Sequence, residues 1–399
     1  MLWAMKDAAK TVKGALVAMG AIALSACITS EPARVTFGPK MPIVDAADTS
    51  LPIRYDLRIP DRDAAYRTSI FEQLYAGLGR EDLTAATSDE YRPASCAPHP
   101  SNVSGEQAVL DAIVDAAENA RIVIVNESHV VSRHRNFTAE LAARLEPLGF
   151  THFAAETFSN PTDGVPPVLE SVGLPYPRDV DGHYSSEPAF GRLLRTVKRL
   201  GYIPVPYEDN VQRDRSAPVA QQIAWREAFQ AQALADALAE AGPDARMLVH
   251  VGYSHARETP IGFSDGREDL WMAARLRDLT GIDPLTISQY QCREESGPIR
   301  LAGNGPDAPE GAFDFVIAHP VTRFEGQRPT WRAEAGDLRV SVPAPLIPTQ
   351  GAHVVEARLS GEPEAAVPMD RVLIFPGETV DLLLPAGNYE LRAVQAMMD

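Results

Sequence analysis

The chain has 399 residues, of which 45% are hydrophobic, and its 54 acidic and 37 basic residues give a net charge of −17. An acidic surplus of this size argues against binding to nucleic acid and against electrostatic adhesion to anionic lipid, because both need basic surfaces. The length is sufficient for one large and one small domain, and the hydrophobic fraction is that of a globular protein.

The N-terminus has the pattern of a lipoprotein export signal. Three lysines precede an apolar run at residues 15–26, which is too short to span a bilayer. The run ends in Leu-Ser-Ala-Cys, a lipobox in which the thiol of Cys27 takes the lipid. We therefore predict a signal peptide at residues 1–26, a lipid carrying palmitate on Cys27, and an envelope protein that faces the periplasm. Ile28 stands where Asp would retain a lipoprotein at the inner membrane, which favours the outer membrane. The alternative is an ordinary secretory signal with an incidental cysteine.

Two cysteines remain after Cys27, namely Cys96 and Cys292. Export into an oxidising compartment predicts a disulfide between them, and two free thiols are the alternative. Neither cysteine lies in a C-x-x-C motif, so a thiolate zinc site is disfavoured.

Residues 27–52 are polar, contain proline and lack periodicity, which predicts a tether. The next segment, residues 53–335, alternates apolar strand runs with helical patterns of ten or more residues. This alternation predicts an α/β domain whose parallel or mixed sheet is covered by helices on both faces. Helices are expected at 66–78, 106–118, 136–148, 190–200, 218–241 and 270–279, and strands at 121–126, 152–155, 202–207, 247–252, 285–291 and 313–318.

The pattern changes near residue 336, where helical periodicity stops and turns rich in Pro and Gly separate short apolar runs. These features predict a small all-β sandwich over residues 336–399, serving as an accessory module without catalytic residues. Its strands are expected at 339–342, 353–359, 372–374, 380–384 and 389–394.

Carboxylates and imidazoles follow successive strands of the predicted sheet. Glu127 and His129 come directly after the first strand, Glu156 ends the second, and His255 follows the fourth. In open α/β sheets, ligands bind outside the carboxyl ends of the strands. We therefore expect these four side chains to converge at one edge of the sheet.

Two chemistries suit these residue types. The four side chains could ligate a divalent metal that activates water. Alternatively, a histidine acts as a general base while a glutamate orients it. The sequence contains no G-x-S-x-G elbow, which disfavours a serine hydrolase, and no phosphate-binding or dinucleotide-binding glycine motif.

The motifs also resemble those of a known superfamily. It joins the ChaN-like haem-binding uptake proteins, the Tiki/TraB proteins and the erythromycin-esterase-like enzymes, and the resemblance covers residues 107–320. The motifs that carry the resemblance are Asn126-Glu-Ser-His129, Ala155-Glu156, Arg226-Glu227 and Gly252-Tyr-Ser-His255.

The resemblance implies roles for individual residues. Asn126 stands where the superfamily has glycine, and because Asn tolerates left-handed backbone geometry, the turn can survive this replacement. Gly252 matches the glycine of the late turn. The resemblance implies catalytic roles for Glu127, His129, Glu156, His255, Arg226 and Glu227.

Three functions remain in competition. The first is a hydrolase of an ester or amide bond in a small-molecule or peptide ligand, with or without a metal. The second is a haem or iron uptake lipoprotein without catalysis, in which His134 and Tyr253 contact the cofactor. The third is an envelope scaffold without enzymatic activity. His250 lies inside a predicted strand and is expected to be a hydrogen-bonded histidine of the core.

Overall fold

The computed structural model describes residues 33–48, 55–58, 64–161, 163–208, 214, 216–263, 266–305 and 308–398. The predicted signal peptide and Cys27 lie outside these residues. The chain from Arg34 to Asp399 forms one compact unit. Within the described part, no helix is both long enough and apolar enough to cross a membrane.

A seven-stranded sheet forms the centre of the α/β part, in the order β10-β11-β9-β3-β6-β4-β5. All neighbours in this sheet pair in parallel except β10 and β11, which are antiparallel. The sheet is therefore mixed, as the sequence predicts. Its strands are β3 (Ile122–Glu127), β4 (Phe150–Ala155), β5 (Ile203–Val205), β6 (Arg246–Gly252), β9 (Leu285–Glu294), β10 (Arg300–Ala302) and β11 (Phe315–Pro320).

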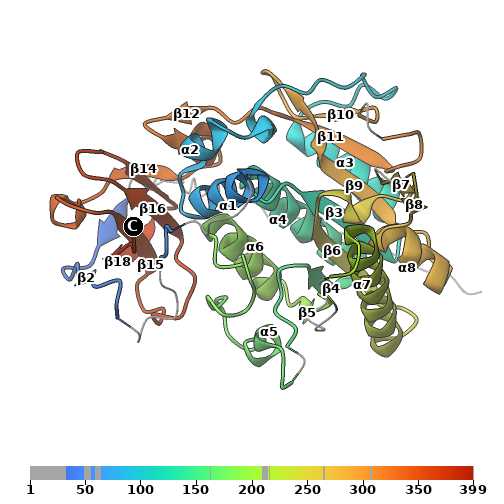
Figure 1. The fold of residues 1–399 in the computed structure, drawn as a ribbon, viewed down its shortest axis with the longest axis horizontal. Helices are drawn as coiled ribbons and strands as arrows, with labels where there is room; N and C mark the ends of the chain where they lie inside the picture. The colour runs from blue at the N-terminus through green and yellow to red at the C-terminus, as the bar shows by residue number, and fades with distance from the viewer. Residues whose placement is uncertain are drawn as a thin grey trace, which may run out of the picture. The chain divides into compact units, whose positions relative to one another are not determined.

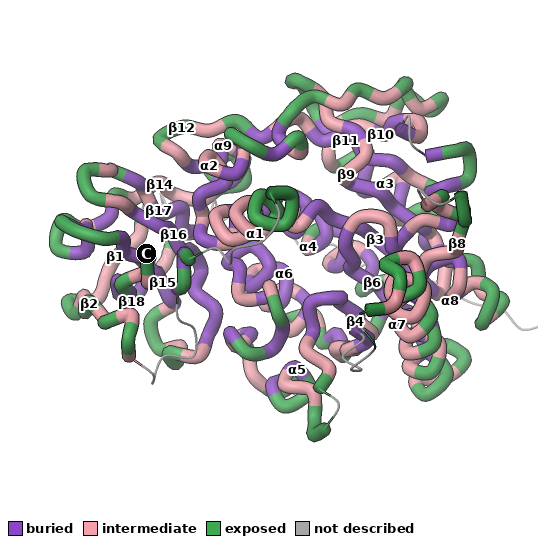
Figure 2. The backbone as a smooth tube through the Cα atoms, viewed as in Figure 1, coloured by how far each residue is buried: buried purple, intermediate pink, exposed green. Residues whose placement is uncertain are grey.

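Helices cover both faces of this sheet (Figure 1), which confirms the predicted fold class. Successive side chains of a strand point to opposite faces, so β3 contributes Val123 and Val125 to one core and Ile122 and Ile124 to the other. All six residues of β3 are buried (Figure 2). The first face carries α3 (Glu106–Ala117), α4 (Arg133–Leu145) and α6 (Pro188–Arg199), and the second carries α7 (Val219–Ala241) and α8 (Met272–Thr280).

The remaining elements are short or peripheral. The helix predicted at 66–78 is present as α1 (Ala64–Gly77). The others are α2 (Glu81–Ala85), α5 (Pro167–Glu170), α9 (Thr330–Glu334), β7 (Ile261–Gly262), β8 (Glu268–Asp269), β12 (Phe324–Glu325) and β13 (Arg328–Pro329).

The C-terminal strands form two small sheets around a shared apolar core. One sheet pairs β15 (His353–Leu359) with β16 (Asp370–Ile374) and β18 (Gly387–Gln395), and the other pairs β14 (Leu338–Ser341) with β17 (Asp381–Leu384).

Part of the predicted tether is structured, which corrects that prediction. Two strands, β1 (Val35–Phe37) and β2 (Ile43–Val44), pair in parallel with β18 on the side that β15 leaves free (Figure 1). Val35 and Phe37 also pack against the core of the C-terminal sheets. The runs are too short to show a strand period in the sequence, and only an available strand edge makes them strands.

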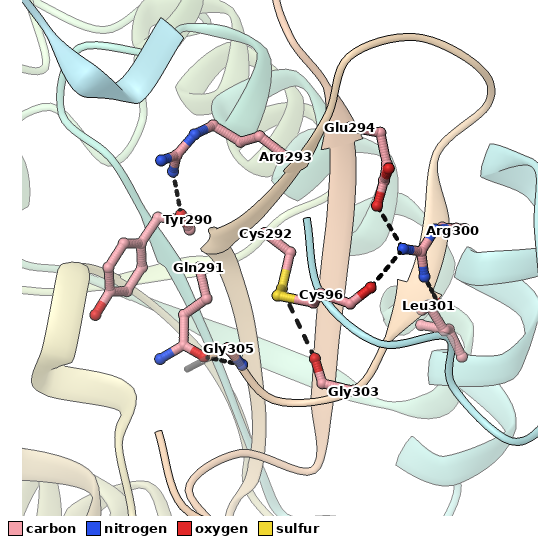
Figure 3. The surroundings of a disulfide bond; sticks show 10 residues. All are labelled: Cys96, Tyr290, Gln291, Cys292, Arg293, Glu294, Arg300, Leu301, Gly303 and Gly305. Carbon is pink, nitrogen blue, oxygen red and sulfur yellow. Dashed lines mark hydrogen bonds and ion pairs between the residues drawn. A yellow bond between two sulfur atoms is a disulfide. The ribbon is translucent and has the colours of Figure 1, made fainter. Parts of the chain in front are cut away.

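A disulfide joins Cys96 to Cys292 on β9, with 5.6 Å between the two Cα atoms (Figure 3). It links the segment that precedes α3 to β9, an inner strand of the sheet. Arg300 stabilises the same region. Its side chain donates a hydrogen bond of 3.0 Å to the backbone oxygen of Cys96 and forms an ion pair with Glu294. The structure thus contains the cysteine pair that the sequence predicts.

Candidate active site

The predicted polar residues meet at the carboxyl edge of the seven-stranded sheet. Glu127 is the last residue of β3, and Glu156 directly follows β4. Strand β6 lies between these two strands and ends at Gly252. A short 3-10 helix, Tyr253–Ala256, then carries His255. Because the three strands are parallel, their side chains are delivered to one place.

The first half of the site is a histidine held by a buried glutamate. Nδ1 of His129 lies 3.0 Å from Oε1 of Glu127, which is fully buried. Arg135 binds both oxygens of Glu127 at 2.8 and 3.0 Å, and Nε2 of His250 lies 3.0 Å from Oε2. Burial disfavours the charged carboxylate, but Arg135 and His250 outweigh it and hold the pKa of Glu127 well below its usual value. Glu127 is therefore an anion that fixes the His129 ring.

The second half repeats this arrangement. Nδ1 of His255 donates to Oε2 of Glu227 at 2.9 Å, and Glu227 also accepts from the backbone N–H of Met272 at 2.8 Å. Nε2 of His255 accepts from Nη1 of Arg226 at 2.8 Å and lies 3.6 Å from Glu156. Burial disfavours the imidazolium, but the carboxylates of Glu156 and Glu227 outweigh it and raise the pKa of His255. A protonated Nε2 could no longer accept a hydrogen bond from Arg226, and it would instead be attracted to the carboxylate of Glu156.

Glu156 lies between the two histidines. It accepts from the backbone N–H of Gly252 at 2.6 Å and from the Tyr184 hydroxyl at 3.3 Å, and it pairs with Arg226. Burial opposes ionisation, but the two histidines and Arg226 lower the pKa of Glu156 to about 2. A Cβ on Gly252 would lie 2.6 Å from Nε2 of His129 and 2.9 Å from Oε2 of Glu156. Only glycine therefore permits both side chains to approach the β6 backbone.

The predicted metal set does not fit this geometry. Arg135 occupies both oxygens of Glu127, while Arg226 pairs with Glu156 and with Glu208. The carboxylate lone pairs that a cation would need are thus directed at guanidinium groups. Over the described ranges, no group of three or more His, Cys, Asp or Glu side chains is arranged to hold a metal ion.

Two residues predicted to contact a cofactor have other surroundings. His134 is buried behind the turn, where its Nδ1 accepts from the backbone N–H of Ser128 at 3.0 Å and burial lowers its pKa to about 3. It supports the turn that carries His129 and does not line the site, which corrects the prediction. Tyr253 does lie at the site, with its ring centroid 4.9 Å from that of His129 in an edge-on arrangement.

The turn after β3 survives with Asn126, but without left-handed backbone geometry at this residue. Asn126 is an extended residue of β3, and the residue with positive φ is Tyr253, at 41°. The Asn126 side chain donates to the backbone oxygen of Tyr253 at 2.6 Å and accepts from the backbone N–H of Gln289 at 2.8 Å. It thus ties the strained turn before His255 to strand β9.

Sequence reasoning missed three residues of the site. Arg135, Tyr184 and Glu187 are not among the predicted site residues. Glu187 accepts from Arg135 at 2.8 Å and caps α6 through two backbone N–H groups. Its position before Pro188 is typical of a helix N-cap, a signal that was available. No local signal marks Tyr184, because it reaches Glu156 from the Pro-rich insertion between β4 and α6, at about residues 159–186.

No protein-family model matches the chain, and no curated protein matches it. Among solved structures, the type III effector HopBA1 is similar at a TM-score of 0.35 and 18% identity, over 58% of this chain and 99% of that one. RRSP, a MARTX toxin effector domain from Vibrio vulnificus CMCP6, is similar at a TM-score of 0.32 and 13% identity, over 54% of this chain and 44% of that one. The C-terminal region of Pasteurella multocida toxin, described with a thiol-protease-like catalytic triad, is similar at 0.32 and 12% identity, over 84% of this chain and 58% of that one. Scores this low assign neither a family nor an activity to this chain, which has a Glu/His site at the carboxyl edge of an α/β sheet.

Proposed function

We propose that the protein is a hydrolase of ester or amide bonds that works through its two histidines without a resident metal. The observation that supports this proposal is the paired arrangement, in which a glutamate holds Nδ1 of each histidine and both rings approach Glu156. A fixed Nδ1 leaves Nε2 to exchange protons with a substrate.

The roles follow from the surroundings of each group. His129 is the more exposed of the two histidines, at 17% of its side chain against 8%, so its Nε2 takes the proton from an attacking water. Arg226 is 35% exposed and stabilises the oxyanion that forms as water adds to the carbonyl carbon. His255, between two carboxylates, donates its Nε2 proton to the leaving oxygen or nitrogen. The bond to the leaving group then breaks, giving a carboxylic acid and an alcohol or amine.

The pH dependence of hydrolysis tests these roles. An acid must be protonated, so kcat/KM for an alkyl ester is expected to fall as the pH rises through the pKa of His255, which the carboxylates of Glu156 and Glu227 raise above the usual pKa of a histidine. Glu156→Gln removes one of the carboxylates that raise this pKa, so the alkaline limb should move down by about one pH unit or more. A pH–rate profile of both proteins measures the shift. An alkaline limb at the same pH in both would show that another group titrates.

We also propose that the protein is attached to the cell envelope, at the outer membrane, by lipid on Cys27. The lipobox supports this proposal, since its small residues directly precede the cysteine. Cys27→Ser is expected to move the protein from the membrane fraction to the soluble fraction, because a firm attachment needs the acyl chains. Fractionation followed by immunoblotting measures this, and retention of the variant at the wild-type level would refute the anchor.

A further inference from the structure

A polar cavity opens at the carboxyl end of β11. It has a volume of about 200 Å³ and lies between the residues that follow β11, the first residue of α4 and the helix α9. Its polar lining includes Arg133, Ser296, Thr322, Arg323, Thr330 and Trp331. The carboxyl end of a sheet is where α/β folds bind ligands, and the Glu/His site described above does not use this part of the edge.

The two arginines of this cavity have no counter-charge in contact. Nowhere in the described part of the chain does a hydrogen bond or an ion pair join the side chain of Arg133 or Arg323 to another residue. Arg133 is half-buried, and this burial lowers its pKa. By contrast, the buried Arg135, Arg328 and Arg332 each bind a carboxylate. Arg133 is thus a half-buried guanidinium group without a carboxylate in contact, beside the exposed Arg323 in the same cavity.

An unpartnered indole adds an independent observation. Trp331 lines the cavity and is 7% exposed, and its buried Nε1 has no hydrogen-bond partner. Buried donors normally have an acceptor, so this group calls for one. The hydroxyls of Thr322 and Thr330 provide further polar lining. The one carboxylate of the lining, Glu334, is exposed and attracts Arg133 without forming an ion pair with it.

The first turn of α4 separates this cavity from the Glu/His site. Arg135 binds Glu127, whereas Arg133, two residues earlier, lines the cavity. Residues two apart on a helix do not share a face, so the two arginines serve different places.

We propose that this cavity binds the phosphate group of a small molecule, through Arg133 and Arg323. Guanidinium groups bind phosphate oxygens through paired N–H donors, and the threonine hydroxyls offer further donors to a group that presents several oxygens. The proposal does not rest on the hydrolase function. The same chemistry is found in a soluble phosphate ester and in a phospholipid headgroup.

Isothermal titration of the full-length protein with sodium phosphate, against sodium chloride at matched ionic strength, tests the site. Wild type should bind phosphate, and Arg133→Ala and Arg323→Ala should each weaken binding tenfold or more. Arg199→Ala, an exposed arginine on α6, is the matched control and should bind as wild type does. Arg323 is exposed, so its replacement should leave the fold intact if Arg133→Ala does not fold. Equal binding by wild type and Arg323→Ala would overturn the proposal.

Two further arms identify the source of the phosphate. Glycerol 3-phosphate should compete with inorganic phosphate, whereas acetate should not, because a carboxylate offers only two oxygens. Competition by acetate at the same concentration would overturn the assignment to phosphate. Binding to phosphatidylglycerol vesicles that Arg323→Ala abolishes, without binding of glycerol 3-phosphate, would overturn the assignment to a small molecule in favour of a lipid headgroup.

Discussion

Replacing His255 with alanine is expected to lower kcat/KM for an alkyl ester by about two to four orders of magnitude, the usual contribution of a general acid. The alkoxide leaving group needs a proton, and the His255 imidazolium, held by Glu227 and near Glu156, is the group placed to give it. A nitrophenyl ester should be affected far less, since nitrophenolate departs without a proton. Initial rates on the two ester classes measure the difference.

His129→Ala is the matched control for this result. Because His129 activates water in the proposal, its loss should lower hydrolysis of both ester classes alike. His129→Ala leaves Glu127 bound to Arg135 and near His250, so this variant should unfold near the wild-type temperature. His255→Ala removes a partner of the buried Glu227 and should unfold at a lower temperature, so its activity is measured where circular dichroism shows it folded. An equal loss on both ester classes in His255→Ala would contradict the role of acid, and undiminished activity in both variants would contradict the assignment of hydrolysis to these two histidines. Absence of hydrolysis by the wild type on either ester class would contradict the hydrolase itself.

Replacing Arg135 with methionine is expected to lower the free energy of unfolding by about 3–5 kcal/mol, the cost of leaving a buried charge without its partner. Arg135 binds both oxygens of Glu127 and one oxygen of Glu187, and both Arg135 and Glu127 are buried. Because methionine retains much of the side-chain volume, the loss of unfolding free energy measures the removal of the charge rather than the creation of a cavity. Urea denaturation followed by circular dichroism measures it.

The double variant Glu127→Gln, Arg135→Met is the control, because it removes both charges. It should be more stable than Arg135→Met alone, although its hydrolytic activity should be lost together with the group that holds His129. If the free energy of unfolding of the single Arg135→Met variant lies within about 1 kcal/mol of the wild-type value, the prediction is wrong. Water or His250 would then compensate the charge of Glu127, contrary to the usual cost of an unpaired buried charge.

The hydrophobic periodicity of the sequence predicted most of the helices and strands of the fold. The helices α3, α6 and α7 and the strand β15 lie at the predicted residues to within two positions. These elements have a face or a stripe that must be buried, so the 3.6-residue or two-residue period appears in the sequence. The strands β1 and β2 are too short to have one, which is why the segment was predicted as a tether.

For the site, the sequence determined which residue types follow each strand, and hence which four side chains would meet. It could not determine their partners. Arg135, Tyr184 and Glu187 reach the site from α4, the Pro-rich insertion and the start of α6, and only the packing of these segments on the sheet brings them close. The same packing decides that each histidine of the site is bound at Nδ1 by a glutamate, an arrangement that differs from the predicted set of metal ligands. Arg135 from α4 neutralises Glu127, and Arg226 from α7 neutralises Glu156. Contacts between side chains from separate segments of the chain do not appear as a local sequence pattern.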